Sequence, residues 1–217
     1  MLIWSAASWV GIGDGVTQAE MLTLNVALHV GTLAAVVLYF WRMVFDVAQG
    51  GIDALLFRKT YNRRLFLFVV IASLPLMAAG LAVATFVPDA WLLNPMVVAT
   101  ATLVFGLVLL FADIGFGSRR AAKDITVVDA LVFGLMQCLA LIPGTSRSGI
   151  TMTAGRMLSI NRTDAARLSM VLSIPAIIAA GGYETFSTVS AGNWELSRLA
   201  LLGAGLAFVS AVIAIWL

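Results

Sequence analysis

Residues that could bind an anion lie close together at positions 144–149, where the sequence reads GTSRSG. One arginine, three hydroxyl side chains and two glycines occupy six consecutive positions. Arginine carries a permanent charge on a planar fork of N–H donors, which suits phosphate oxygens. The glycines permit tight turns and let a ligand approach the backbone. These residue types at this spacing indicate a site for an oxyanion with more than one negative charge.

The residues around the cluster predict how it is held. Pro143 ends one helix, because proline disfavours helical backbone in the residue before it and has no N–H group to donate. The amides near Ser148 begin the next helix, where unpaired N–H groups and the helix dipole favour an anion. Thr151 follows Arg147 by four residues and lies on the same helical face. The sequence therefore predicts an anion site at a break between two short helices.

A simpler interpretation is available for each residue taken alone. Serine and threonine in membrane helices often bond only a backbone carbonyl or a neighbouring helix. An arginine can extend its charged end to the membrane surface. The whole cluster at a glycine-flanked helix break nevertheless favours the anion site.

The composition indicates a chain that uses lipid as its solvent. Hydrophobic residues make up 61% of the 217 and charged residues 11%, with a mean hydropathy of +1.02. A soluble domain carries about 25% charged residues. The net charge of +2 is too small to suggest a nucleic-acid partner. Cys138 is the one cysteine, which excludes an internal disulfide and a cysteine-based metal cluster. His29 is interpreted as a buried helix-packing residue.

Five apolar segments have about the twenty residues that a membrane-crossing helix needs. They are residues 24–41, 65–87, 94–111, 165–183 and 199–217. We expect an all-α fold, a polytopic helical bundle that forms one integral membrane domain over residues 1–217.

Residues 129–160 are predicted to form a re-entrant hairpin. The fifteen residues that end at Pro143 extend only about 22 Å as a helix. Residues 42–64 contain five Lys or Arg and residues 118–129 contain three, so both segments are expected on the cytoplasmic side. A single crossing by 129–160 would put Arg156 and two later arginines outside, whereas a hairpin keeps them inside. An arginine at the tip of such a hairpin indicates a functional site.

Two stretches of the sequence resemble the undecaprenyl-diphosphatase family. PGTSRSGITMTAGR, running on into INRTDAARLSMVLSIPAI, is similar to the family signature, and LNVALHVGTLAAVVLYFWR is similar to the segment after its first hairpin. The resemblance implies a multi-pass hydrolase of the bacterial inner membrane that removes the terminal phosphate of undecaprenyl diphosphate. Such enzymes recycle the lipid carrier for peptidoglycan and confer bacitracin resistance. Their fold has two inverted halves, each beginning with a re-entrant hairpin.

The resemblance also implies roles for particular residues and partners. Arg147 is expected to clamp the diphosphate, with Ser146 and Ser148 as the other catalytic residues. Four residues are expected to bind the substrate: Gly144, Thr145, Gly149 and Thr151. The expected partners are a polyprenyl diphosphate lipid and membrane lipid, and a homo-oligomer is compatible with the sequence.

The sequence departs from the family pattern at both ends. The family's first hairpin carries a Glu-x-x-x-Glu pair and a Ser-Gly-His element, which this sequence lacks, and a last helix is also missing. The family implies a divalent cation, Mg²⁺ or Ca²⁺, whose expected carboxylate ligands are absent. Asp14 and Glu20 are six residues apart and do not share a helix face. The alternative is a fragmentary or degenerate relative, a non-catalytic transporter or lipid-phosphate binder with the same anion site.

Overall fold

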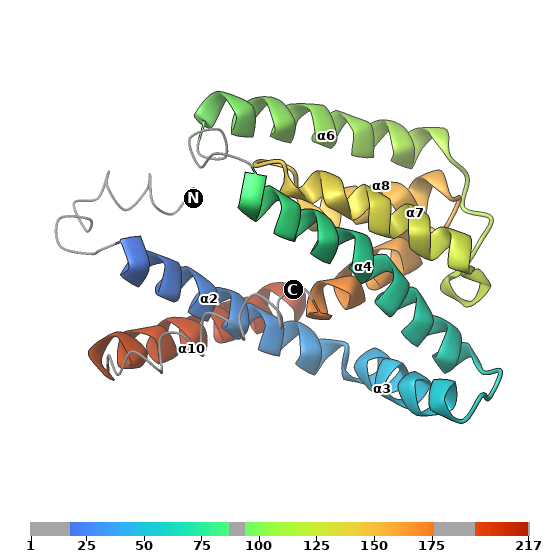
Figure 1. Cartoon of the computed structure of the whole chain (residues 1–217), viewed down its shortest axis with the longest axis horizontal. Coiled ribbons are helices and arrows are strands. Elements are labelled where there is room, and N and C mark those ends of the chain that lie inside the picture. Colours follow the sequence, from blue (N-terminus) through green and yellow to red (C-terminus); the bar gives the residue numbers. More distant parts are fainter. Residues whose placement is uncertain (1–17, 87–93, 176–193, 217) are drawn as a thin grey trace. The chain divides into compact units, whose positions relative to one another are not determined.

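The computed structural model describes residues 18–86, 94–175 and 194–216, and its regular structure there is helical (Figure 1). Within these ranges the one β-type contact is an isolated pairing of Arg120 with Ile160. The chain divides into two compact units. The terminal unit comprises Met1–Trp41 with Ile174–Leu217, and the central unit is Arg42–Ser173. The predicted all-α fold is confirmed.

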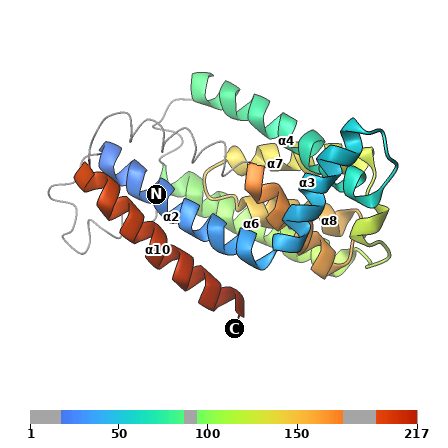
Figure 2. The same ribbon diagram turned by 90° about the horizontal axis from the view of Figure 1, so that it is seen from below.

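Two helices pack along each other in the terminal unit, α2 (Gln18–Tyr39) and α10 (Trp194–Trp216), as Figures 1 and 2 both show. A Cβ atom added at Gly31 would lie 2.1 Å from the Ala204 carbonyl oxygen, so the two backbones are in direct contact. Leu28, three residues earlier, also faces α10. His29 is exposed, because it lies on a different face from these two residues. The prediction that His29 is buried is therefore wrong.

The central unit is built from helices stacked around a buried core. They are α3 (Trp41–Leu55), α4 (Tyr61–Phe86), α6 (Pro95–Gly115), α7 (Val127–Cys138), α8 (Arg147–Met157) and a helix over residues 162–175. α7 contacts α4 and α8, and α8 also contacts α6 (Figure 1). Leu65, Phe133 and Leu168 are fully buried in the core. The rings of Phe68 and Phe133 meet edge to face with their centres 5.0 Å apart.

Side-chain caps fix where two of these helices begin. The Asn94 side chain accepts a hydrogen bond from the Met96 amide at 2.9 Å, and Pro95 opens the first turn of α6. Thr126 and Asp129 cap α7 reciprocally, each side chain accepting from the other's backbone amide. Local sequence therefore sets these starts, and packing then selects the buried faces.

Arg120 ties together the two ends of the segment that was predicted to be a hairpin. Its Nη2 donates to Asp129 Oδ2 at 2.6 Å, at the start of α7. Its Nη1 donates to the Leu158 carbonyl at 3.4 Å, just after α8. Between them the chain runs through α7, a short 3₁₀ helix (η2, Leu139–Leu141), a turn and α8. The chain thus returns to where it began, and the broken-helix hairpin expected over 129–160 is present.

Two described helices are long and apolar enough to cross a membrane, and they mark the chain as a membrane protein. These are Tyr61–Val83 within α4 and Pro95–Gly115, which is α6. The predicted spans 24–41 and 199–217 fall on α2 and α10. The predicted span 165–183 begins in the helix over 162–175, and its remainder lies outside the described residues.

Residues 42–64, which the number of Lys and Arg predicts to be a basic loop, form a helix over much of their length. The basic residues lie at the two ends of this segment, whereas the interval between them carries the apolar and small residues of α3. A Cβ atom at Gly50 would lie 2.0 Å from the Asn62 carbonyl oxygen, so α3 packs directly on the start of α4. A count of Lys and Arg does not detect this amphipathic helix, and the side of the membrane on which it lies stays a prediction.

Gly134→Ala is expected to destabilise the protein by about 1–3 kcal/mol. The added Cβ would lie 2.9 Å from both the Ala72 carbonyl oxygen and Pro75 Cγ, so α4 and α7 must separate. Unfolding in detergent, followed by circular dichroism, measures the change. Gly106→Ala is the matched control, because a Cβ there meets nothing within 4 Å. Equal stability of the two variants would contradict this close contact between helices.

Candidate functional site

Gly144 fixes the tip of the hairpin against α6. Its φ is +91°, a backbone angle that residues other than glycine rarely adopt. A Cβ atom there would lie 2.2 Å from the Val98 carbonyl oxygen. Thr102 Oγ1 donates to the Gly144 carbonyl at 3.0 Å. Only glycine fits this conformation and this space, so α6 determines where the tip lies.

Ser146 begins α8 and shapes its open end. Its backbone is extended, with φ −67° and ψ 121°, and its hydroxyl accepts from the Gly149 amide at 3.2 Å. The Ser146 and Ser148 hydroxyl oxygens are 3.2 Å apart. The amides of Arg147 and Ser148 have no carbonyl within the helix to bond, because they precede its first turn of hydrogen bonds. Donors and the positive end of the helix dipole therefore meet at one place.

The side chain of Arg147 is only lightly engaged. The side chain is partly buried. Among the described residues, its Nη1 donates a hydrogen bond to the Ser173 carbonyl at 3.5 Å. That distance is long for a hydrogen bond from nitrogen to oxygen. A guanidinium has five N–H donors, so most of its capacity remains for a ligand.

Arg156, on the same helix, is engaged throughout. Its Nε donates to Asp113 Oδ1 at 2.9 Å, and its Nη1 donates to Ser118 Oγ at 3.0 Å and to the Ile160 carbonyl at 2.7 Å. Its Nη2 donates to the carbonyls of Asp113 and Phe116. Its side chain is 5% exposed. Arg156 is thus a structural residue, in contrast to Arg147.

Thr145 offers a buried hydroxyl beside the start of α8. The residue is 8% exposed, and its Oγ1 has no hydrogen-bond partner within the described part of the chain. A buried polar group without a partner costs about 1–3 kcal/mol. A ligand oxygen within reach of this hydroxyl would relieve that cost, and the role of Thr145 in binding stays a prediction.

Thr151 lies in a different setting from the other predicted residues. It is 1% exposed, and its hydroxyl is 2.6 Å from Ser169 Oγ and 2.9 Å from the Arg147 carbonyl. Ser169 Oγ also donates to the Ser148 carbonyl at 3.2 Å. The Thr151 hydroxyl is therefore used in holding the first turn of α8 against the helix over 162–175. Its geometry favours positioning over direct contact with a ligand.

Ser169 is absent from the residues predicted from the sequence. A signal for it exists, because Ser169 and Ser173 are four residues apart in an apolar segment and share a helix face. Serines in membrane helices are too common for that spacing to identify a site without the structure.

Most described carboxylates of the central unit lie toward the other end of α8 from Arg147. Asp113 binds both Arg156 and Arg162, with Arg162 Nε at 2.8 Å from Asp113 Oδ1. The hydrogen bond to Asp129 raises the pKa of the Arg120 guanidinium above its ordinary value. Arg156 is nine residues from Arg147, about 14 Å along the helix axis. These ion pairs therefore hold the base of the hairpin, and none of those among the described residues involves Arg147.

A divalent cation does not fit the described residues. No group of three or more His, Cys, Asp or Glu side chains that could hold a metal occurs among them. Asp14 lies outside the described ranges, and Glu20 belongs to α2, where its side chain is not described.

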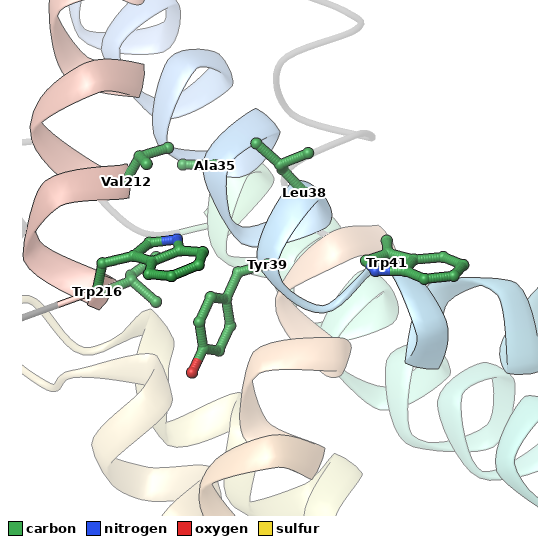
Figure 3. A pocket seen from close by; sticks show the side chains of 7 residues that line it. Ala35, Leu38, Tyr39, Trp41, Val212 and Trp216 are labelled. Atoms are coloured by element: carbon green, nitrogen blue, oxygen red, sulfur yellow. The ribbon is translucent and has the colours of Figure 1, made fainter.

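A hollow of about 390 Å³ lies within the terminal unit, between the ends of α2 and α10 (Figure 3). Aromatic and aliphatic side chains line it: Ala35, Leu38, Tyr39, Trp41, Val212, Ile215 and Trp216. It contains no charged side chain, so it does not suit an anion. The tip of the hairpin, with Arg147 and the amides of α8, is the candidate site.

The sequence matches the family described as bacitracin resistance protein BacA over residues 3–217. The chain belongs to this family. The resemblance inferred from the motif at residues 143–156 is thereby confirmed, and that motif is the hairpin tip together with α8.

Curated relatives named undecaprenyl-diphosphatase match most of the chain. The protein of Roseobacter denitrificans is 43% identical over 195 residues, 89% of this chain and 73% of the relative. That of Saccharophagus degradans is 40% identical over 180 residues, 82% of this chain and 68% of the relative. That of Ruegeria pomeroyi is 43% identical over 194 residues, covering 88% and 72% of the two chains.

Thr151→Val is expected to loosen the first turn of α8. The substitution keeps the shape but removes the hydroxyl that reaches Ser169, so amide hydrogen exchange over residues 146–150 should rise when measured by mass spectrometry. Thr153→Val is the matched control, because the Thr153 hydroxyl bonds only the Gly149 carbonyl of its own helix among the described residues. Equal exchange in the two variants would show that the contact with Ser169 does not hold this turn.

Proposed function

We propose that the chain hydrolyses undecaprenyl diphosphate to undecaprenyl phosphate and inorganic phosphate at the tip of the hairpin. The observation that carries the proposal is the state of Arg147, a partly buried guanidinium at an open helix start with one long hydrogen bond. Family membership and the names of the relatives support the same reaction. Those relatives are phosphatases, which favours hydrolysis over transport.

The residues of the tip would act mainly by stabilising charge. Hydrolysis breaks the bond between the terminal phosphorus and the bridging oxygen, water supplies the new oxygen, and the lipid phosphate leaves. In the transition state the negative charge spreads over the phosphoryl oxygens. Arg147 can donate two parallel hydrogen bonds to them, and the amides of Arg147 and Ser148 add donors from the backbone. Ser146, Ser148 and the unpaired Thr145 hydroxyl supply further donors at the same tip.

The other expected residues serve the shape of this site. Gly144 and Gly149 keep the backbone accessible to the diphosphate, and Thr151 holds the turn that carries Arg147. The family resemblance implies Mg²⁺ or Ca²⁺, but the described residues provide no ligand set for it. We therefore assign no step of the reaction to a cation.

With this substrate, we expect the protein to lie in the inner membrane of a bacterium. The polyprenyl chain would lie in the bilayer, with its diphosphate at the hairpin tip. The product is the carrier lipid on which peptidoglycan precursors are assembled, so the reaction supports cell-wall synthesis and resistance to bacitracin.

Arg147→Ala is expected to lower kcat for phosphate release by about 100-fold or more, because the main charge that stabilises the transition state is lost. Arg147→Lys should recover little, since an ammonium group cannot make the paired contact. Release of inorganic phosphate by the purified full chain measures the effect. Arg119→Ala, in the exposed loop after α6, is the control and should retain activity. An active alanine variant would remove Arg147 from the mechanism, and an inactive unmodified chain would contradict the proposed function.

Ser146→Asp separates helix capping from anion binding. Aspartate caps a helix about as well as serine, so α8 and the thermal stability should be preserved. Its carboxylate would repel the diphosphate, so KM should rise and kcat should fall. Ser146→Ala is the comparison, because it removes the cap without adding charge. Unchanged kinetics in the aspartate variant would place the phosphate elsewhere.

A further inference from the structure

The corner between α3 and α4 exposes large apolar side chains directly beside basic ones. Leu55 is 80% exposed, Leu56 55% and Phe57 83%. Arg58 and Lys59 follow at once. The Arg58 side chain is 66% exposed, and its Nη1 lies 3.9 Å from Asp53 Oδ1 in a loose ion pair. Exposure of these apolar side chains to water is unfavourable, because their transfer to an apolar environment lowers the free energy.

The backbone of the corner presents Phe57 in an unusual way. Its φ is +54°, in the left-handed region. The Arg58 amide donates to the Asp53 carbonyl at 2.9 Å and the Phe57 amide to the Ala54 carbonyl at 3.2 Å. This pair of bonds closes many helices, but glycine normally occupies the left-handed position. A phenylalanine held there at an energetic cost indicates a functional reason for its outward side chain.

Buried contacts hold the corner rigid from behind. Asp53 is 7% exposed, and its Oδ2 accepts from Thr60 Oγ1 at 2.6 Å. Thr60 Oγ1 in turn accepts from the Arg63 amide at 3.1 Å, at the start of α4. The tip is thus fixed by an internal network, and its apolar residues do not fold back onto the core.

The corner lies next to a candidate membrane span in the sequence. The apolar helix that can cross the membrane begins at Tyr61, directly after the corner. Phe45 and Ile52, exposed by 61% and 58%, lie seven residues apart on one face of α3. Leu55, three residues after Ile52, continues this exposed apolar face. On its other side α3 packs on the core through Met43 and Val47.

We infer that this corner is an anchor for anionic phospholipid. Leu55, Leu56 and Phe57 lie in the boundary between headgroups and acyl chains, and the exposed face of α3 lies along the same layer. Arg58 and Lys59 contact lipid phosphates, because clustered basic residues beside a membrane helix attract anionic headgroups. The partner is the surface of an anionic bilayer. The inference is independent of the proposed phosphatase activity.

Depth measurement in lipid nanodiscs tests the apolar part. Bimane is attached to cysteine at position 45, 52 or 57, one at a time, in a Cys138→Ala background. Nanodiscs contain phosphatidylcholine with 30% phosphatidylglycerol, and nitroxide lipids quench the label at known depths. All three labels should be quenched most by a shallow nitroxide, at least twofold more than a control label at Lys123, an exposed residue in the loop between α6 and α7.

Two results would overturn the apolar part. If α3 continues α2 as one broken span, quenching depth will change by about 18 Å between positions 45 and 57. If the corner faces water, quenching of the label at position 57 will equal quenching of the label at Lys123. If a second copy of the chain covers the corner, quenching at position 57 will change with the number of protein copies per nanodisc and not with the depth of the nitroxide.

Substitution of the basic pair tests the charged part. Arg58→Gln with Lys59→Gln should lower the ratio of phosphatidylglycerol to phosphatidylcholine retained by the purified full chain at least threefold, as measured by native mass spectrometry. Arg119→Gln with Lys123→Gln is the matched control, because it removes the same charge from the exposed segment between α6 and α7. Equal lipid ratios in both double variants would overturn the anionic preference.

Discussion

Arg120 joins both ends of the broken helix, and the rest of the central unit depends on that junction. A guanidinium that binds a carboxylate at the start of α7 and a carbonyl after α8 requires the chain to turn back between them. A re-entrant position of this hairpin stays a prediction, and it would require protein or a polar hollow around the irregular turn. The helices α6 and α4 flank the hairpin and supply that protein surface.

Two arginines on α8 illustrate how environment assigns a role to one residue type. Arg156 is buried and donates to a carboxylate, a hydroxyl and several carbonyls, so its charge is neutralised and its geometry is fixed. Arg147 lies two and a half turns away, and its recorded contact within the described residues is long. None of the ion pairs among the described residues involves Arg147, so its charge at the tip is not neutralised by the carboxylates near the base of the hairpin.

Several features of this structure follow from the sequence because local chemistry determines them. The break near Pro143, the helix start close to Ser148 and the apolar helices are properties of neighbouring residues. Other features depend on residues far apart in the chain. The contact of Thr151 with Ser169 joins two helices and cannot be predicted from either one alone. A count of Lys and Arg does not predict α3, because it ignores the spacing of the apolar residues. The exposed position of His29 also depends on packing, because the contact with α10 determines which face of α2 is covered.

The close fit of Gly144 against α6 has a thermodynamic consequence. Val98 and Thr102 hold the turn in a single conformation before any ligand arrives. A flexible loop would lose conformational entropy on ordering around a charged headgroup, and that loss would weaken association. Here the ordering accompanies folding, so the affinity of the tip is limited by desolvation of the partners.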